Sequence, residues 1–73
     1  GRLEHHRVEV GDDSGVTHTV IVYVSEDPDG WGWWWETGKD GWGGENPPDR
    51  VAPSAEEAYI AALDDVGARL RSP

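Results

Sequence analysis

Five tryptophans lie close together in the chain and are the side chains best suited to binding chemistry: Trp31, Trp33, Trp34, Trp35 and Trp42. The chain has no Phe, Met or Cys, so these indoles carry most of its aromatic surface. Each Trp side chain presents roughly 150–250 Å² to be buried or exposed. Trp and Tyr concentrate in binding hot spots, so we expect roughly two or three indoles in the core and the others, with Tyr23, on a partner-binding surface.

The acidic side chains are the second group of residues that could select a partner. Fifteen Asp and Glu stand against six Lys and Arg, which gives a formal net charge of −9. Such a charge repels nucleic acid and favours a basic protein partner, although solubility alone also explains it. The candidate contact residues besides the aromatic ones are Asp27, Asp29, Glu57, Asp64 and the apolar Ile60.

A calcium-loop pattern occurs around the first tryptophans. Counted from Ser25, Asp27 and Asp29 occupy positions three and five, Gly30 position six and Glu36 position twelve, close to the EF-hand spacing. However, Ser replaces the first Asp and the flanking residues are typical of strands, so a hairpin turn explains the pattern more simply. We therefore expect no metal site and no cofactor.

Catalytic residues are not recognisable in the sequence. His18 could act as a base, but no Ser has a recognisable nucleophile context and the chain has no Cys. The pairs Asp12/Asp13 and Asp64/Asp65 are expected to be solvated instead of paired for acid–base work. An enzyme is not expected.

The elements that position these residues begin with strands. Val8 to Val10 alternate apolar and charged side chains, and residues 16–25 are rich in β-branched residues, both typical of strands. Turns are predicted at residues 11–15, 27–30 and 38–41. Trp31 to Thr37 forms a third predicted strand, and Trp42 opens a short fourth one.

The last element is a predicted helix over residues 55–70. Ser54 is a natural N-cap, and Glu57 three residues later completes a capping box. One apolar stripe repeats at helical spacing and consists of Ala55, Tyr59, Ala62, Leu63, Val66 and Leu70. Ile60 lies outside this stripe.

The predicted fold is therefore α+β, a single domain over residues 1–73 with a three- or four-stranded antiparallel sheet packed on one C-terminal helix. One helix covers only one face of such a sheet, so the other face is solvated, dimerised or bound to a partner. That second face carries either Ile21 and Tyr23 with some of the tryptophans, or the row Val20, Val22 and Val24. Both rows are apolar.

Residues 53–63, Pro-Ser-Ala-Glu-Glu-Ala-Tyr-Ile-Ala-Ala-Leu, follow the predicted strand pair 19–24 and 31–37. This layout resembles small βββα proteins of phages and mobile elements, among them anti-CRISPR inhibitors, and HicB-type antitoxins. The resemblance covers about residues 16–70 and implies a non-catalytic inhibitor. In place of the Pro-Gly-Cys-like segment usual in the antitoxins, this chain has Asn46-Pro47-Pro48-Asp49.

The expected function is a non-catalytic acidic module that masks a basic surface of a nucleic-acid-handling partner, as an anti-CRISPR-like inhibitor would. The alternatives are an antitoxin-type module that neutralises a small basic toxin, and a small-ligand binder that uses the Trp face. A homodimer is compatible with each of these functions. The lack of Cys and of apolar runs of about 18 residues favours a cytoplasmic protein without membrane contact. Leu3-Glu4-His5-His6 is similar to a vector-derived tag fragment, so residues 1–6 are expected to be disordered or tag-derived.

Overall fold

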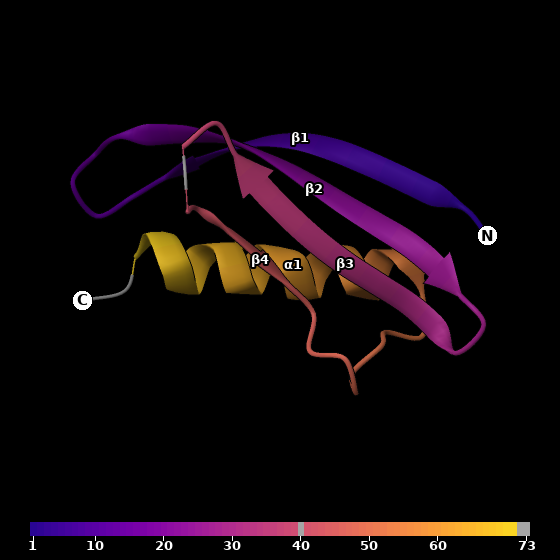
Figure 1. Cartoon of the computed structure of the whole chain (residues 1–73). Coiled ribbons are helices and arrows are strands. Elements are labelled where there is room, and N and C mark those ends of the chain that lie inside the picture. Colours follow the sequence, from indigo (N-terminus) through magenta and orange to yellow (C-terminus); the bar gives the residue numbers. More distant parts are fainter. Residues whose placement is uncertain (40, 72–73) are drawn as a thin grey trace.

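The computed structural model describes residues 1–39 and 41–71 (Figure 1). The elements are β1 (Leu3–Gly11), β2 (Thr17–Asp27), β3 (Gly30–Thr37), β4 (Gly43–Glu45) and α1 (Ala55–Leu70). The four strands form one antiparallel sheet in the order β1-β2-β3-β4. The predicted α+β arrangement, with a short fourth strand and one C-terminal helix, is thus confirmed.

Strand β1 begins earlier than the alternation at Val8 predicted. Leu3 pairs with Ser25 and Gly11 with Thr17, so the whole strand runs along β2 in unbroken antiparallel register. Residues 3–6 are therefore part of the sheet, which corrects the expectation that they are disordered. The sequence signal was weak because residues 4–6, Glu-His-His, are all polar or charged and show no apolar alternation.

The β2–β3 hairpin sets the two faces of the sheet. Val22 pairs with Trp35 and Val24 with Trp33, whereas Tyr23 pairs with Trp34. Opposite residues of an antiparallel pair share a face, and neighbours along a strand alternate between faces. Trp33 and Trp35 therefore lie on one face with the valines, and Trp34 lies on the other with Tyr23.

The turn between β2 and β3 depends on a glycine. Gly30 has φ 146°, and a Cβ built on it would lie 2.7 Å from the carbonyl oxygen of Ala52. This close approach accompanies a two-way backbone bridge, because Trp31 and Ala52 each donate an N–H to the other's carbonyl oxygen at 2.8 Å. The segment before the helix is thus tied to the start of β3.

Helix α1 begins and ends where the sequence predicted. Ser54 is the N-cap, and its Oγ accepts the Glu57 N–H at 3.2 Å. The Glu57 carboxylate accepts from the same hydroxyl at 3.2 Å, which brings negative charge to the helix N-terminus. The fully buried positions of the helix are Ala58, Ala62, Val66 and Leu70, a row at helical spacing.

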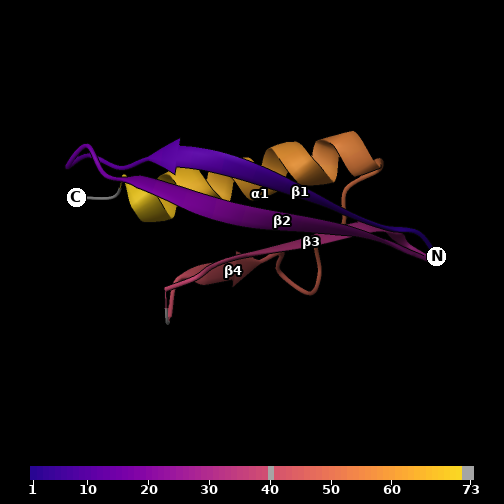
Figure 2. The ribbon, with the colours of Figure 1, turned by 90° about the horizontal axis from the view of Figure 1, so that it is seen from above.

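The helix covers one face of the sheet, and Figure 2 shows the two layers. It packs mainly over β2, β3 and β4. Between the layers lies the core, which consists of Val20, Val22, Val24, Trp33, Trp35 and the four buried helix residues. The small side chains of Ala58 and Ala62 leave room for the two indoles. The valine row thus packs against the helix, and the row with Ile21 and Tyr23 is left open.

Candidate interaction surface

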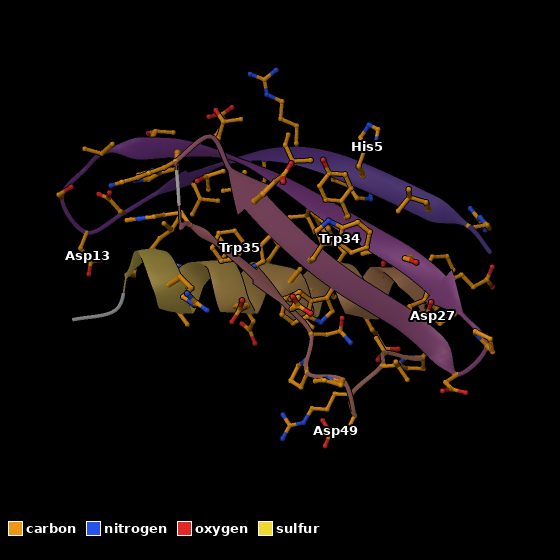
Figure 3. All side chains as sticks on the ribbon, in the orientation of Figure 1. His5, Asp13, Asp27, Trp34, Trp35 and Asp49 are labelled. Carbon is orange, nitrogen blue, oxygen red and sulfur yellow. The ribbon has the colours of Figure 1, made fainter. Side chains whose placement is uncertain are left out.

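The open face of the sheet carries a stacked aromatic pair. The rings of Tyr23 and Trp34 lie 4.9 Å apart between centroids and within 8° of parallel. Trp34 keeps 38% of its surface exposed, although it sits in the middle of a strand. Figure 3 shows Trp34 on the side of the sheet away from the helix, and Trp35 at the opposite face beside the helix. We call Tyr23 and Trp34 the aromatic platform.

Polar groups fix the platform in place. The Tyr23 hydroxyl donates to Oε1 of Glu36 at 3.1 Å, and this bond holds the pKa of Tyr23 above its usual value of 10.0. On the other side, His5 meets the Tyr23 ring edge-on at a centroid distance of 6.1 Å. The platform is therefore ordered in the free chain, which lowers the entropy cost of binding through it.

Carboxylates border the platform. Glu45 on β4 is the direct register partner of Trp34, and Glu36 lies on the same face two residues along β3. A Cβ on Gly32 would lie 3.3 Å from Oδ2 of Asp27, so that carboxylate lies beside Gly32 on β3. An aromatic surface within such a negative border suits a cationic side chain.

The other four indoles do not belong to this surface. Trp35 is 2% exposed and Trp33 is 8% exposed, so both belong to the core. This matches the expectation that two or three indoles are buried and removes Trp35 from the candidate contacts. Trp31 and Trp42 are half-buried and pack against the core from its two ends.

The remaining candidates lie on separate parts of the molecule. Asp29 is exposed in the β2–β3 turn, and Glu57 caps the helix. Ile60 is 56% exposed, as its place outside the helical stripe predicted. Asp64 is exposed on the helix near the loop before it. The structure thus joins Tyr23, Trp34 and Asp27 on one face and leaves the helix residues on the other side.

A groove between α1 and the segment before it was not predicted. It encloses about 790 Å³ and is lined by Trp33, Glu45, Pro47, Arg50, Val51, Ala52, Ala61, Asp64, Asp65 and Ala68. The acidic residues come from β4 and the helix, and the apolar floor includes Trp33. Because the groove depends on the course of an irregular segment, no periodicity in the sequence indicates it.

A second unpredicted cluster joins the two hairpins. Oδ1 of Asp12 accepts the N–H and the hydroxyl of Ser14 and the N–H of Val16, while its Oδ2 lies 2.7 Å from Nε2 of His18. These hydrogen bonds, that of Ser14 first, hold the pKa of Asp12 well below its ordinary 3.8. The expectation that Asp12 is merely solvated is therefore wrong. His18 in turn stacks on Trp42 at 5.2 Å between centroids.

The calcium-loop pattern is a hairpin. Ser25 and Asp27 end β2, Gly30 begins β3, and Glu36 pairs with Ile21 at the far end of the hairpin. Glu36 is therefore remote from the turn and instead bonds Tyr23. Among residues 1–39 and 41–71, no three His, Asp or Glu side chains gather in a way that could hold a metal ion.

Comparisons with known proteins identify no relative. No protein-family model matches the chain, and no curated protein and no solved structure matches it. Within the described residues, α1 is the one helix, and it is neither long nor apolar enough to cross a membrane.

Proposed function

We propose that this chain is a non-catalytic acidic protein-interaction module that binds and masks a basic surface of a partner, of the kind that handles nucleic acid. The observation that carries the proposal is the aromatic platform: an exposed Trp34 stacks on a half-buried Tyr23, on the sheet face that no helix covers. An inhibitor from a phage or mobile element, such as an anti-CRISPR protein, is the biological setting that fits this chemistry.

The platform supplies the attractive contact. Trp, Tyr and Arg are enriched among the residues that dominate binding energy, and Arg is more often than Lys the cation in contacts with aromatic rings. An Arg or Lys of the partner placed over an indole gains roughly 0.5–2 kcal/mol from the ring quadrupole. Glu36 and Glu45 lie beside the indole on β3 and β4, where they add charge complementarity for the same cation.

The net charge supplies steering. A chain with formal charge −9 attracts basic partners over distance and repels nucleic acid, so it competes with nucleic acid for the same basic surface. Steering of this kind weakens with added salt, whereas aromatic contacts persist. Binding should therefore lose on-rate as the ionic strength rises, and the platform should determine the off-rate.

The test is capture from a bacterial lysate with three immobilised baits at low and at high salt: the wild-type chain, Trp34→Ala and Ile60→Ala. Trp34 and Ile60 are both exposed apolar residues, but they lie on opposite layers, so Ile60→Ala is the matched control. We expect a basic nucleic-acid-handling protein on the wild-type and Ile60→Ala baits, weakened by salt and at least about tenfold depleted on Trp34→Ala.

Other outcomes separate the remaining functions. A single small toxin-like protein retained by the platform would favour the antitoxin alternative. Partners that bind Trp34→Ala as well as wild type would contradict the proposal, provided that all three baits show the same circular dichroism.

The groove next to Trp33 supports a second candidate function, the binding of a small cationic ligand. Its volume of about 790 Å³ and its two acidic helix residues, Asp64 and Asp65, are the features that favour it. Amide shifts in a small-molecule screen decide between the surfaces. Shifts confined to Arg50 and Val51 support the groove, and shifts at Tyr23 and Trp34 support the platform.

A further inference from the structure

The outer edge of β1 has backbone groups directed away from the sheet. The Glu26 N–H donates to the Arg2 carbonyl oxygen at 2.8 Å, and the Asp12 N–H donates to that of Val16 at 2.9 Å. Hydrogen-bonded pairs alternate with non-bonded pairs along an antiparallel ladder. The even-numbered residues of β1 therefore bond to β2, and the odd-numbered residues direct their N–H and C=O groups outward.

This edge is long and regular. Natural sheets protect edge strands with charged side chains, Pro, bulges or very short length. The charged residues of β1 have both signs, Glu4, Arg7 and Glu9, so a second copy can meet them with opposite charge. Strand β1 spans Leu3–Gly11, contains neither Pro nor Lys, and keeps unbroken register with β2. At the other edge of the sheet, β4 has only three residues. The two edges of the same sheet thus differ, and β1 is the one suited to pairing.

We propose that two copies of this chain pair through β1, antiparallel, about a two-fold axis at Val8. The two four-stranded sheets then join into one continuous sheet of eight strands. The inference goes beyond the proposed function and does not depend on it, because the platform lies on β2 and β3 and stays exposed.

Charge complementarity between the two β1 strands favours one register. With the axis at Val8, Arg7 of each copy faces Glu9 of the other, on the open face of the sheet. The same axis places Glu4 opposite Asp12, just beyond the strand, where the Asp12 carboxylate is already bonded to Ser14, Val16 and His18. An axis at Arg7 or at Glu9 places like charges directly opposite each other, which is destabilising. An axis at His6 places Arg7 opposite His5 and Glu9 opposite Leu3, so it forms no ion pair.

In the same register, the second copy also packs against the helix-side face of β1. Val8 and Val10 are half-buried at the margin of the core, where α1 packs mainly over the other three strands. With the axis at Val8, Val8 meets Val8 of the second copy, and Val10 meets His6. The apolar row of one core is then continuous with that of the other.

The first test is a charge swap, followed by sedimentation equilibrium at about 0.15 M salt, where the Debye length is about 8 Å. Arg7→Glu and Glu9→Arg should each raise the dimer dissociation constant at least about tenfold, and the double swap should restore it to within about threefold. Glu56→Arg on the exposed helix surface is the control and should leave the dimer dissociation constant unchanged or slightly lower.

The two single swaps alter net charge in opposite directions, so an effect of overall charge alone would weaken one dimer and strengthen the other. Such opposite effects would overturn the proposal. So would a wild-type chain that stays monomeric at millimolar concentration. Association with a strand of another protein, with no self-association, would overturn it as well.

Amide hydrogen exchange gives a second measurement that needs no substitution. In the proposed register the outward amides of His5, Arg7, Glu9 and Gly11 become protected as concentration rises, whereas that of Leu3 stays fast. Protection of Leu3 with fast exchange at Gly11 would indicate an axis at His6 and would overturn the register. Uniformly fast outward amides would overturn the dimer itself.

Discussion

Nε1 of Trp35 donates a hydrogen bond to Oδ2 of Asp65 at 2.8 Å, and this contact joins the middle of the sheet to the last turns of the helix. The indole is 2% exposed, so its N–H has little access to water. Asp65 was expected to be a solvated member of an acidic pair, and the structure corrects this. The bond ties α1 to β3 at Asp65, whereas the adjacent Asp64 is exposed.

Replacing Asp65 with Ala should therefore destabilise the fold. The buried indole N–H is left unpaired, which costs about 1–3 kcal/mol in the free energy of unfolding measured with urea. Asp64→Ala is the matched control, because it makes the same change one residue earlier and should stay within about 0.5 kcal/mol of wild type. Asp65→Asn keeps an acceptor and should lie between the two. Equal losses for both alanine variants would show that the hydrogen bond is not the cause.

Gly44 should tolerate no side chain. It pairs with Trp35 across β3 and β4, and a Cβ there would lie 2.7 Å from Nε1 of Trp35 and closer still to the Asp65 carboxylate. Gly44→Ala should lower the free energy of unfolding by about 1–3 kcal/mol, because both partners must move. Gly38→Ala, where a Cβ meets no heavy atom within 4 Å, is the control for the glycine effect itself. A loss at Gly38 as large as at Gly44 would contradict the packing explanation.

The element order and the helix bounds could be predicted because each carries a local signal. The β-branched run ending at Val24, the turn at Pro28 and the cap at Ser54 each specify one backbone conformation. The start of β1 could not be predicted, because residues 4–6 are all polar or charged and show no apolar alternation.

The candidate site was predictable only in part. The alternation of side chains along each strand separated Trp34 from Trp33 by face. However, both side-chain rows of β2 are apolar, so the sequence did not show which row packs against the helix. The choice follows from packing across the sheet, where small helix residues such as Ala62 accommodate the indole pair. The role of Asp65 depends on a contact with Trp35, 30 residues away in the chain, and that of Asp12 depends on the turn geometry that brings Ser14, Val16 and His18 to one carboxylate. A residue type alone indicates neither.

The N-cap should contribute a measurable share of helix stability. Ser54→Ala removes the acceptor for the Glu57 N–H and should lower the free energy of unfolding by about 1 kcal/mol. Ser54→Asp keeps an acceptor at the cap and adds a negative charge that suits the helix N-terminus, so it should retain most of the stability. Urea unfolding followed by circular dichroism measures both. If Ser54→Asp were as unstable as Ser54→Ala, capping would not explain the loss.

Stability should fall in acid through Asp12. The pKa of this carboxyl is well below 3.8 in the folded chain and near 3.8 in the unfolded chain, so the unfolded state binds a proton first as the pH decreases. The contribution of Asp12 is therefore complete above about pH 5 and is lost progressively below pH 3.8. Asp12→Asn removes it, so that variant should melt at a lower temperature than wild type near neutral pH.

The measurement is the melting temperature between pH 6 and pH 3 for wild type, Asp12→Asn and Asp13→Asn. The difference in melting temperature between wild type and Asp12→Asn should become smaller as the pH falls. The contacts of Ser14 and His18 favour the ionised carboxylate, and its stabilising contribution decreases as the unfolded chain becomes protonated. Asp13, exposed in the same turn, is the matched control, and its variant should run parallel to wild type. A difference for Asp12→Asn that stays constant across the range would mean that the folded carboxylate is not stabilised in its charged form.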